Sequence, residues 1–242
     1  MAPVAYLLYQ KVMRHDPTDT HWIGRDRFVL SIGHSSLTLY TQLYLSGYGL
    51  EIDDLRKFRT LGSLTPAHPE YGHTDGVETT TGPLGQGIAN AVGFAMAERH
   101  LNALYGDDIV NHYTYVIAGD GCLMEGISQE AISLAGHLQL GRLILLWDDN
   151  RITDDGSTEL SISENVADRF RVAHWHVQEV DGHDMAAVSD AIEAARASPQ
   201  PSMIACRTTI AKGIARLQGQ RGGHSGRLFD ADAQAARALL QW

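Results

Sequence analysis

The sequence predicts an α/β protein, with a doubly wound, mostly parallel sheet of about five strands and helices on both faces. Strand-like and helical stretches take turns along the chain. The strand-like stretches are continuous apolar runs, as expected when helices cover both faces of a parallel sheet. The chain has 242 residues, of which 44% are hydrophobic and 20% charged, so it can bury a full core. We therefore expect residues 1–242 to form a single domain.

The expected elements can be assigned in chain order from their residue patterns. An apolar helix is expected first, then a short strand, a helix stopped by Gly47, a polar helix, and a helix whose small residues allow close packing. Strands and helices then alternate cleanly to the end of the sheet. The strands are expected at 28–31, 112–118, 142–147, 175–180 and 201–208, and the helices at 2–13, 35–46, 51–59, 86–105, 124–139, 164–171 and 184–197.

Between the polar helix and the helix at 86–105 lies a long irregular segment. Residues 62–87 are rich in glycine, proline, threonine and histidine. Such a segment in a compact domain is more often a functional loop than a linker.

Composition excludes several classes of function. Lysine and arginine total 19 against 29 for aspartate and glutamate, and the net charge of -10 argues against a nucleic-acid-binding protein. We expect no membrane span, because no run of about 18 apolar residues occurs. The two cysteines, Cys122 and Cys206, lie in apolar runs and suit a reducing compartment, so we expect a cytoplasmic protein.

Two polar residues follow neighbouring strands of the expected sheet. Asp120 follows the strand at 112–118, and Asn150 follows the strand at 142–147. One helical crossover separates these strands, so their carboxyl ends should lie side by side, where ligands bind in such sheets. Mg²⁺ prefers oxygen ligands and takes one or two carboxylates, with phosphates filling the remaining positions. The pair therefore predicts a magnesium site beside a diphosphate, and the glycines around Asp120 let N–H groups approach that anion.

The competing interpretation is that Asp120 caps the following helix and Gly121 makes the turn. Other nucleotide-binding devices are absent from the sequence. It contains no G-x-x-x-x-G-K-[ST], and the GPLGQG stretch at 82–87 does not follow an apolar strand as a dinucleotide fingerprint should.

Several motifs in the same order resemble one enzyme family. Residues 119–153 read GDGCLMEGISQEAISLAGHLQLGRLILLWDDNRIT, which resembles the thiamine diphosphate motif and, in detail, transketolase. The stretches DRFVLSIGHSS, TPAHPEYGHTDGVETTTGPLGQGIANAVG and WHVQEVDGHD are also similar to transketolase. The resemblance runs from about residue 3 to about residue 210, and it implies that residues 211–242 are a diverged tail.

The resemblance implies a role for each matching residue. Asp120, Asn150 and the Ile152 carbonyl would bind magnesium or calcium. Residues implied to line the thiamine diphosphate site are Gly82, Leu84, Gly121, Ile210, His34 and His224.

Further residues are implied to act on substrate or partner. His68 would bind the sugar and assist proton transfer, and Arg59 would lie where the sugar phosphate enters. Glu125 and Glu130 match carboxylates at the family's dimer interface, although helix-dipole stabilisation is an equally simple reason for acidic residues there. The implied activity is transfer of a two-carbon ketol unit from a ketose phosphate to an aldose phosphate.

The chain also departs from the family pattern. Transketolases are more than twice as long, and the resemblance implies that the domain binding the aminopyrimidine ring comes from a second transketolase subunit. The family's early Gly-His-Pro-Gly would lie just upstream of Met1. Asp154 stands where the family has an apolar residue near the thiazolium, and Leu64 replaces a basic residue. HSGRLF replaces His-Gly-Ala-Pro-Leu around His224.

Three interpretations follow from these patterns. The first is a split transketolase, active with a partner chain. The second is a non-catalytic fragment that binds the cofactor weakly or not at all. The third is another thiamine enzyme, such as a deoxyxylulose-phosphate synthase or a dehydrogenase component, which should lack TTTGPLGQG beside TPAHPE. Transketolase ancestry with partner-dependent activity is the interpretation we favour.

Overall fold

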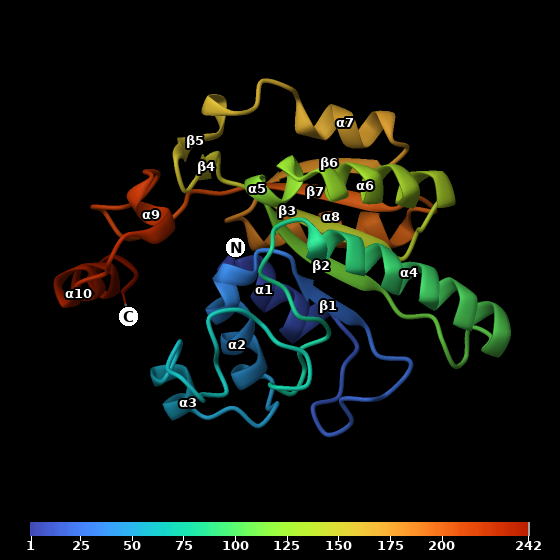
Figure 1. Ribbon diagram of the computed structural model, residues 1–242, viewed down its shortest axis with the longest axis horizontal. Coiled ribbons are helices and arrows are strands. Elements are labelled where there is room, and N and C mark those ends of the chain that lie inside the picture. The colour runs from blue at the N-terminus through green and yellow to red at the C-terminus, as the bar shows by residue number, and fades with distance from the viewer. Residues whose placement is uncertain (242) are drawn as a thin grey trace.

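A computed structural model of the chain describes residues 1–241 and has a five-stranded parallel sheet at its centre (Figure 1). The strand order is β1-β2-β3-β7-β6, and every neighbouring pair is parallel. The strands are β1 (Arg27–Leu30), β2 (Thr114–Gly119), β3 (Leu143–Asp149), β6 (His176–Asp181) and β7 (Ser202–Arg207). All six residues of β2 are buried, as its unbroken apolar pattern requires. The predicted α/β fold class is confirmed.

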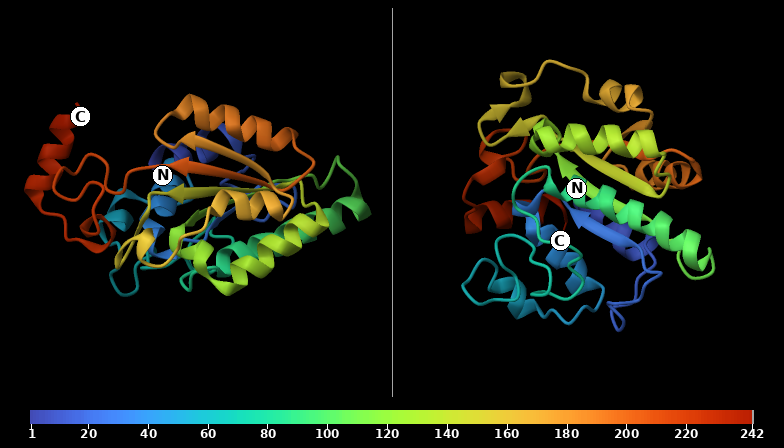
Figure 2. Two further views of the ribbon diagram at one scale, coloured as in Figure 1. Left: turned by 90° about the horizontal axis from the view of Figure 1, so that it is seen from above. Right: turned by 45° about the vertical axis from the view of Figure 1, so that its right-hand side comes forward.

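Helices cover both faces of this sheet. Helices α4, α6 and α7 lie on one face, while α1 and α8 lie on the other (Figure 2). The described helices are α1 (Ala2–Leu7), α2 (Ser36–Leu45), α3 (Ile52–Arg56), α4 (Gln86–Tyr105), α5 (Asp120–Met124), α6 (Gly126–Leu138), α7 (Val166–Val172), α8 (Met185–Ala197), α9 (Gly222–Ser225) and α10 (Asp230–Leu239). No helix within residues 1–241 combines the length and apolar character needed to span a membrane.

Some elements differ from the sequence prediction. The helix expected at 124–139 is broken at Glu125, whose extended backbone (ψ 141°) separates α5 from α6. The first helix continues beyond Leu7 as a π-helical turn, Leu8–Val12, and the helix expected at 51–59 ends at Arg56. The polar loop after β3 contains an unpredicted hairpin, β4 (Ile152–Thr153) with β5 (Gly156–Ser157).

The carboxyl ends of the strands all face one side of the molecule. In the left view of Figure 2 the strands point toward the β4–β5 hairpin, the N-terminus and the segment that carries α9 and α10. Gly119 at the end of β2 pairs in register with Asp148 near the end of β3. This register brings Asp120 and Asn150 to neighbouring strand ends, as their spacing in the sequence predicted.

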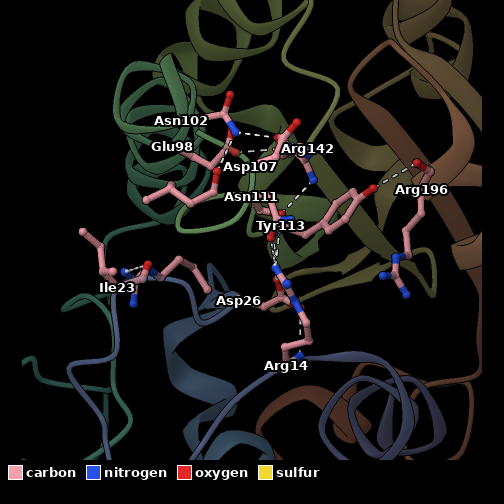
Figure 3. A network of polar contacts seen from close by, with 12 residues as sticks. Arg14, Ile23, Asp26, Glu98, Asn102, Asp107, Asn111, Tyr113, Arg142 and Arg196 are labelled. Carbon is pink, nitrogen blue, oxygen red and sulfur yellow. Dashed lines mark hydrogen bonds and ion pairs between the residues drawn. The ribbon is translucent and has the colours of Figure 1, made fainter. Parts of the chain in front are cut away.

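A network of ion pairs lies near the opposite, amino ends of the strands (Figure 3). Buried Glu98 of α4 forms an ion pair with Arg142, with 3.2 Å between Glu98 Oε1 and Arg142 Nε. The Tyr113 ring lies between two guanidinium groups, with the Cζ atoms of Arg142 and Arg196 at 5.3 and 5.0 Å from the ring centroid. The amino ends of the strands are therefore held by acid–base pairs within the chain.

Candidate functional site

The Asp120 carboxylate sits at the junction between β2 and α5. Gly119 ends the strand and is the N-cap residue of α5, and Asp120 occupies the first helical position. Trp147 Nε1 donates to its Oδ1 and the Arg151 backbone N–H donates to its Oδ2, both at 3.1 Å. Two donors from the neighbouring strand end thus fix the carboxylate, which is only 7% exposed.

The electrostatics of Asp120 favour a bound cation. Burial raises the pKa of Asp120 to about 7, and the charges of Asp149 and Asp148 act in the same direction. Within residues 1–241 the nearby arginines form ion pairs with Asp149 instead, Arg207 at 3.0 Å and Arg151 at 4.0 Å. A cation bound here would stabilise the ionised form of this carboxylate, which burial and its acidic neighbours disfavour.

Asn150 is held beside Asp120 by its own neighbours. Its Nδ2 donates to Asp148 Oδ2 at 3.0 Å, and its Oδ1 accepts from the Ile152 backbone N–H at 2.9 Å. The residue between them, Arg151, has φ 60°, a left-handed conformation that costs free energy for a residue other than glycine. This turn aims the Arg151 N–H at Asp120 and keeps the amide oxygen of Asn150 at the strand end.

The donor set fits magnesium better than zinc. Among the described residues no group of three or more His, Cys, Asp or Glu side chains is placed to hold a metal ion. A cation bound at Asp120 would take this carboxylate together with amide and carbonyl oxygens and groups from a ligand. Mg²⁺ is typically bound in this way, with phosphate oxygens completing its octahedral shell.

A cavity of about 440 Å³ opens beside Asp120. Its walls come from the turn after β1, the loop before α4, the β2–α5 junction, the β4–β5 hairpin and the segment around α9. The predicted site residues that line it are His34, Leu84, Asp120, Gly121, Glu125, Asn150, Ile152, Ile210 and His224. The structure thus brings together nine residues from distant parts of the sequence.

Two histidines lie against each other in the lining of this cavity. The rings of His34 and His224 have centroids 5.0 Å apart. Loss of water contact lowers the pKa of His34, and the nearby positive charges of His224 and His68 lower it further. Neutral His34 is therefore favoured in this arrangement, and its ring can both donate and accept a hydrogen bond.

Four predicted residues lie outside the cavity lining. Gly82 and His68 are in contact just beside it, because a Cβ atom on Gly82 would lie 3.5 Å from His68 Cγ. Arg59 is exposed, and its charge contributes to the lowered pKa of His34. Glu130 is exposed on α6. The predicted sugar-binding residues thus border the cavity, whereas Glu130 belongs to the outer surface of a helix.

Close packing explains one glycine of the GDG motif. A Cβ atom on Gly121 would lie 2.9 Å from Leu84 Cδ1, closer than real side chains approach. A residue with a side chain at 121 would require the end of the Leu84 side chain to shift. Glycine here keeps the backbone N–H of residue 121 at the cavity wall, where it can face an anion.

The structure adds contacts that the sequence did not reveal. Trp147 holds Asp120, and Asp148 holds Asn150. Ser35, Thr153 and Ser161 also line the cavity. A tryptophan at the carboxyl end of an otherwise aliphatic buried strand was the available signal for the first contact, since a buried indole N–H needs an acceptor.

Fold and site together define an α/β domain with a cavity at the carboxyl ends of its parallel strands, the position where ligands bind in such sheets. Comparison with known proteins gives the family. The family model described as "Transketolase, thiamine diphosphate binding domain" matches residues 1–242. The chain therefore belongs to the transketolase family.

Individual relatives agree with this assignment. Transketolase from Cereibacter sphaeroides is 56% identical over 100% of this chain, and that from Geobacillus stearothermophilus is 54% identical over 100% of it. The solved transketolase from Leishmania mexicana superposes with a TM-score of 0.97 at 47% identity, covering 100% of this chain and 37% of its own. The chain spans 37% of the length of both curated relatives.

Proposed function

We propose that the chain binds thiamine diphosphate together with Mg²⁺ or Ca²⁺ and forms the diphosphate-binding part of a transketolase. Asp120, Asn150 and the Ile152 carbonyl would hold the cation, and the Gly121 N–H would face the diphosphate. One observation carries the proposal: the buried Asp120 carboxylate, whose pKa is raised to about 7, lines a cavity of about 440 Å³. The protein's net charge is negative, so an anion held there needs local partners such as a cation and backbone N–H groups.

When bound, thiamine diphosphate supplies an electron sink for a carbanion next to a carbonyl. The chain's own part is to bind, orient and exclude water. Leu84, Ile152 and Ile210 give the cavity apolar walls suited to the cofactor rings. His34 and His224 are placed to hydrogen-bond phosphate or substrate oxygens, and His68 borders the same opening to bind sugar hydroxyls and move a proton.

The proposed substrates are sugar phosphates, a ketose donor and an aldose acceptor. Arg59 is exposed, its charge acts on His34, and it would attract the phosphate at the entrance. The transketolase from Pichia stipitis has been solved in complex with sedoheptulose-7-phosphate, and it is 48% identical to this chain. That relative supports the substrate class proposed here.

The proposed assembly places a second transketolase subunit against α6. Glu125, the N-cap of this helix, and Glu130 are exposed, as are the apolar Ile127 and Leu134 of α6, which are 42% and 43% exposed. Apolar side chains exposed on one helix are suited to the core of an interface, and acidic side chains to its rim. The partner would supply the aminopyrimidine-binding part that the matched region of the relatives does not include.

Cofactor binding is the first test. Thiamine diphosphate titrated in the presence of Mg²⁺ should change the fluorescence of Trp147, which contacts Asp120. Titration without a divalent cation should give little change. Equal binding with and without Mg²⁺, or by Asp120→Ala and the unaltered chain, would contradict the assignment of the cation ligands.

Ketol transfer is the second test. We expect no transfer from xylulose 5-phosphate by the 242-residue chain alone, and transfer after coexpression with a polypeptide that corresponds to the rest of its relatives. The alternative function is a non-catalytic, cofactor-binding chain, favoured by the carboxylate of Asp154 in the cavity wall. Cofactor binding without activity in the coexpressed complex would support that alternative.

A further inference from the structure

The segment after Ala211 forms its hydrogen bonds with the preceding domain at one residue. Within the described part of the chain, two hydrogen bonds connect residues 213–241 with residues before 209, and Asp154 accepts both. Arg221 Nε donates to the Asp154 carbonyl at 2.6 Å. Ser225 Oγ donates to Asp154 Oδ1 at 3.0 Å. Asp154 is thus the polar anchor of this segment, both through its backbone and through its side chain.

The first part of the segment, residues 210–226, holds its own shape. Leu217 is only 6% exposed and packs beneath the glycines of α9. The Gly219 N–H donates to the Ile210 carbonyl at 3.0 Å, and the Gly213 N–H donates to Gln218 Oε1 at 2.8 Å. A coil closed by its own hydrogen bonds can keep its conformation while the anchor at Asp154 forms or breaks.

Asp154 lies at the tip of the β4–β5 hairpin, on one wall of the cavity. Gly223 and His224, from the anchored segment, line the same cavity. The hairpin begins two residues after Asn150, and His224 lies against His34. The Asp154–Ser225 hydrogen bond therefore joins two walls that come from segments about 70 residues apart, close to where the diphosphate is proposed to bind.

We propose that Asp154 is a positioning residue that fastens residues 221–225 to the hairpin tip, closes the cavity over the bound diphosphate and fixes His224 opposite His34. The proposal rests on the proposed function for the identity of the ligand. The fastening itself is a property of the ligand-free chain. It gives the carboxylate at 154 a structural purpose that an apolar residue cannot serve, since such a side chain accepts no hydrogen bond.

The fastening is tested first without any ligand, by hydrogen exchange of residues 213–226. Asp154→Ala should speed exchange there about fivefold, the effect of losing one side-chain hydrogen bond. Ser225→Ala should give a similar change, and the double variant no more than either single one. Asp154→Asn keeps an acceptor oxygen, so its hydrogen-exchange rates should stay near those of the unaltered chain. Asp155→Ala, a change at the neighbouring exposed acid, is the matched control.

The closing of the cavity is tested by the release rate of thiamine diphosphate with Mg²⁺, followed by Trp147 fluorescence. Asp154→Ala should release the ligand about fivefold faster with little change in association rate, and Asp154→Asn should restore slow release. Equal exchange in Asp154→Ala and Asp155→Ala would overturn the fastening. Unchanged or slower release by Asp154→Ala would overturn its action on the cavity. If the ligand does not bind but Asp154→Ala loosens residues 213–226, the proposed function fails and the fastening stands.

Discussion

Buried carboxylates at the two ends of the sheet have opposite electrostatic surroundings. At the amino end, Glu98 pairs with Arg142, and Asp26 has the positive charges of Arg14 and Arg196 around it (Figure 3). These arginines lower the pKa values of their carboxyl neighbours and partly offset the effect of burial. At the carboxyl end, the nearest charges to Asp120 belong to other carboxylates and raise its pKa further.

This difference distinguishes buried carboxylates that are neutralised within the fold from buried carboxylates that can bind a ligand. An acid that the fold itself neutralises contributes to the folded state, and truncating its partner leaves an uncompensated charge. An acid that the fold leaves without a basic partner costs stability and persists where a ligand supplies the missing charge. Asp120 is of the second kind, which is why we assign the cation to it.

The largest expected effect is on the pH dependence of stability without metal. The pKa of Asp120 is raised from 3.8 to about 7 in the folded chain, so the folded state binds the proton more tightly than the unfolded state. The free energy of unfolding should therefore fall as pH rises from about 4 to about 7, by at most about 4 kcal/mol for this group. Urea unfolding at several pH values measures this.

Asp120→Asn is the variant that isolates this contribution. Asp26, Glu98 and Asp149 also have raised pKa values, and they contribute a fall of the same sign to both proteins. In Asp120→Asn, the fall in the free energy of unfolding with rising pH should lack only the contribution of Asp120. Parallel curves of unfolding free energy against pH for the two proteins would show that the surroundings of Asp120 do not raise its pKa.

Asp120→Ala should abolish most of the Mg²⁺-dependent affinity for thiamine diphosphate. Loss of a residue that merely orients a metal ligand weakens binding about 10–100-fold, so loss of the carboxylate ligand should cost on the order of 100-fold or more. Isothermal titration calorimetry measures the change. Asp108→Ala, at an exposed position beyond α4, is the control and should bind normally.

Arg142→Ala at the amino end should give the reverse pattern. It leaves Glu98 buried and unpaired and removes a 2.7 Å hydrogen bond to the Asn111 carbonyl. Because the Arg142 side chain is 34% exposed, we expect a loss of about 2 kcal/mol in the free energy of unfolding, less than for a fully buried pair. Cofactor affinity should be unchanged. The added change Glu98→Gln should restore part of the lost free energy of unfolding. Weaker cofactor binding by Arg142→Ala would contradict the claim that the ion pairs at the amino ends act on stability alone.

The smallest effect is expected at Arg151. Its φ of 60° suits glycine, and its backbone N–H is the group that contacts Asp120. Arg151→Gly should therefore stabilise the chain by up to about 1 kcal/mol and leave cofactor affinity within about twofold. Thermal unfolding followed by circular dichroism checks this. A large loss of affinity would mean that the guanidinium group itself takes part in binding.

The position of the site was predictable because it depends on chain topology. One crossover between β2 and β3 was enough to place Asp120 beside Asn150, and the register of these strands confirms that inference. The motifs also placed His34 and Leu84 at the same cavity. Such features follow from strand order and local turns, which leave a clear pattern in the sequence.

Contacts between side chains were harder to predict. The indole of Trp147 reaches Asp120, and Ser225 reaches Asp154 across about 70 positions, but neither contact leaves a periodic pattern. The break at Glu125 was missed because residues on both sides favour helix, and tertiary packing decided the local conformation. The hairpin after Asn150 was missed because each of its strands has only two residues.

The most direct test of the central claim is the pKa of Asp120 itself, followed by carboxyl-carbon NMR with Asp120→Asn to assign the signal. Without ligand, the titration should be centred near pH 7. With saturating Mg²⁺ and thiamine diphosphate, the pKa of the same carboxyl should fall well below its ordinary range, because the cation supplies the missing positive charge. A pKa that stays near 7 in the presence of both would contradict the account.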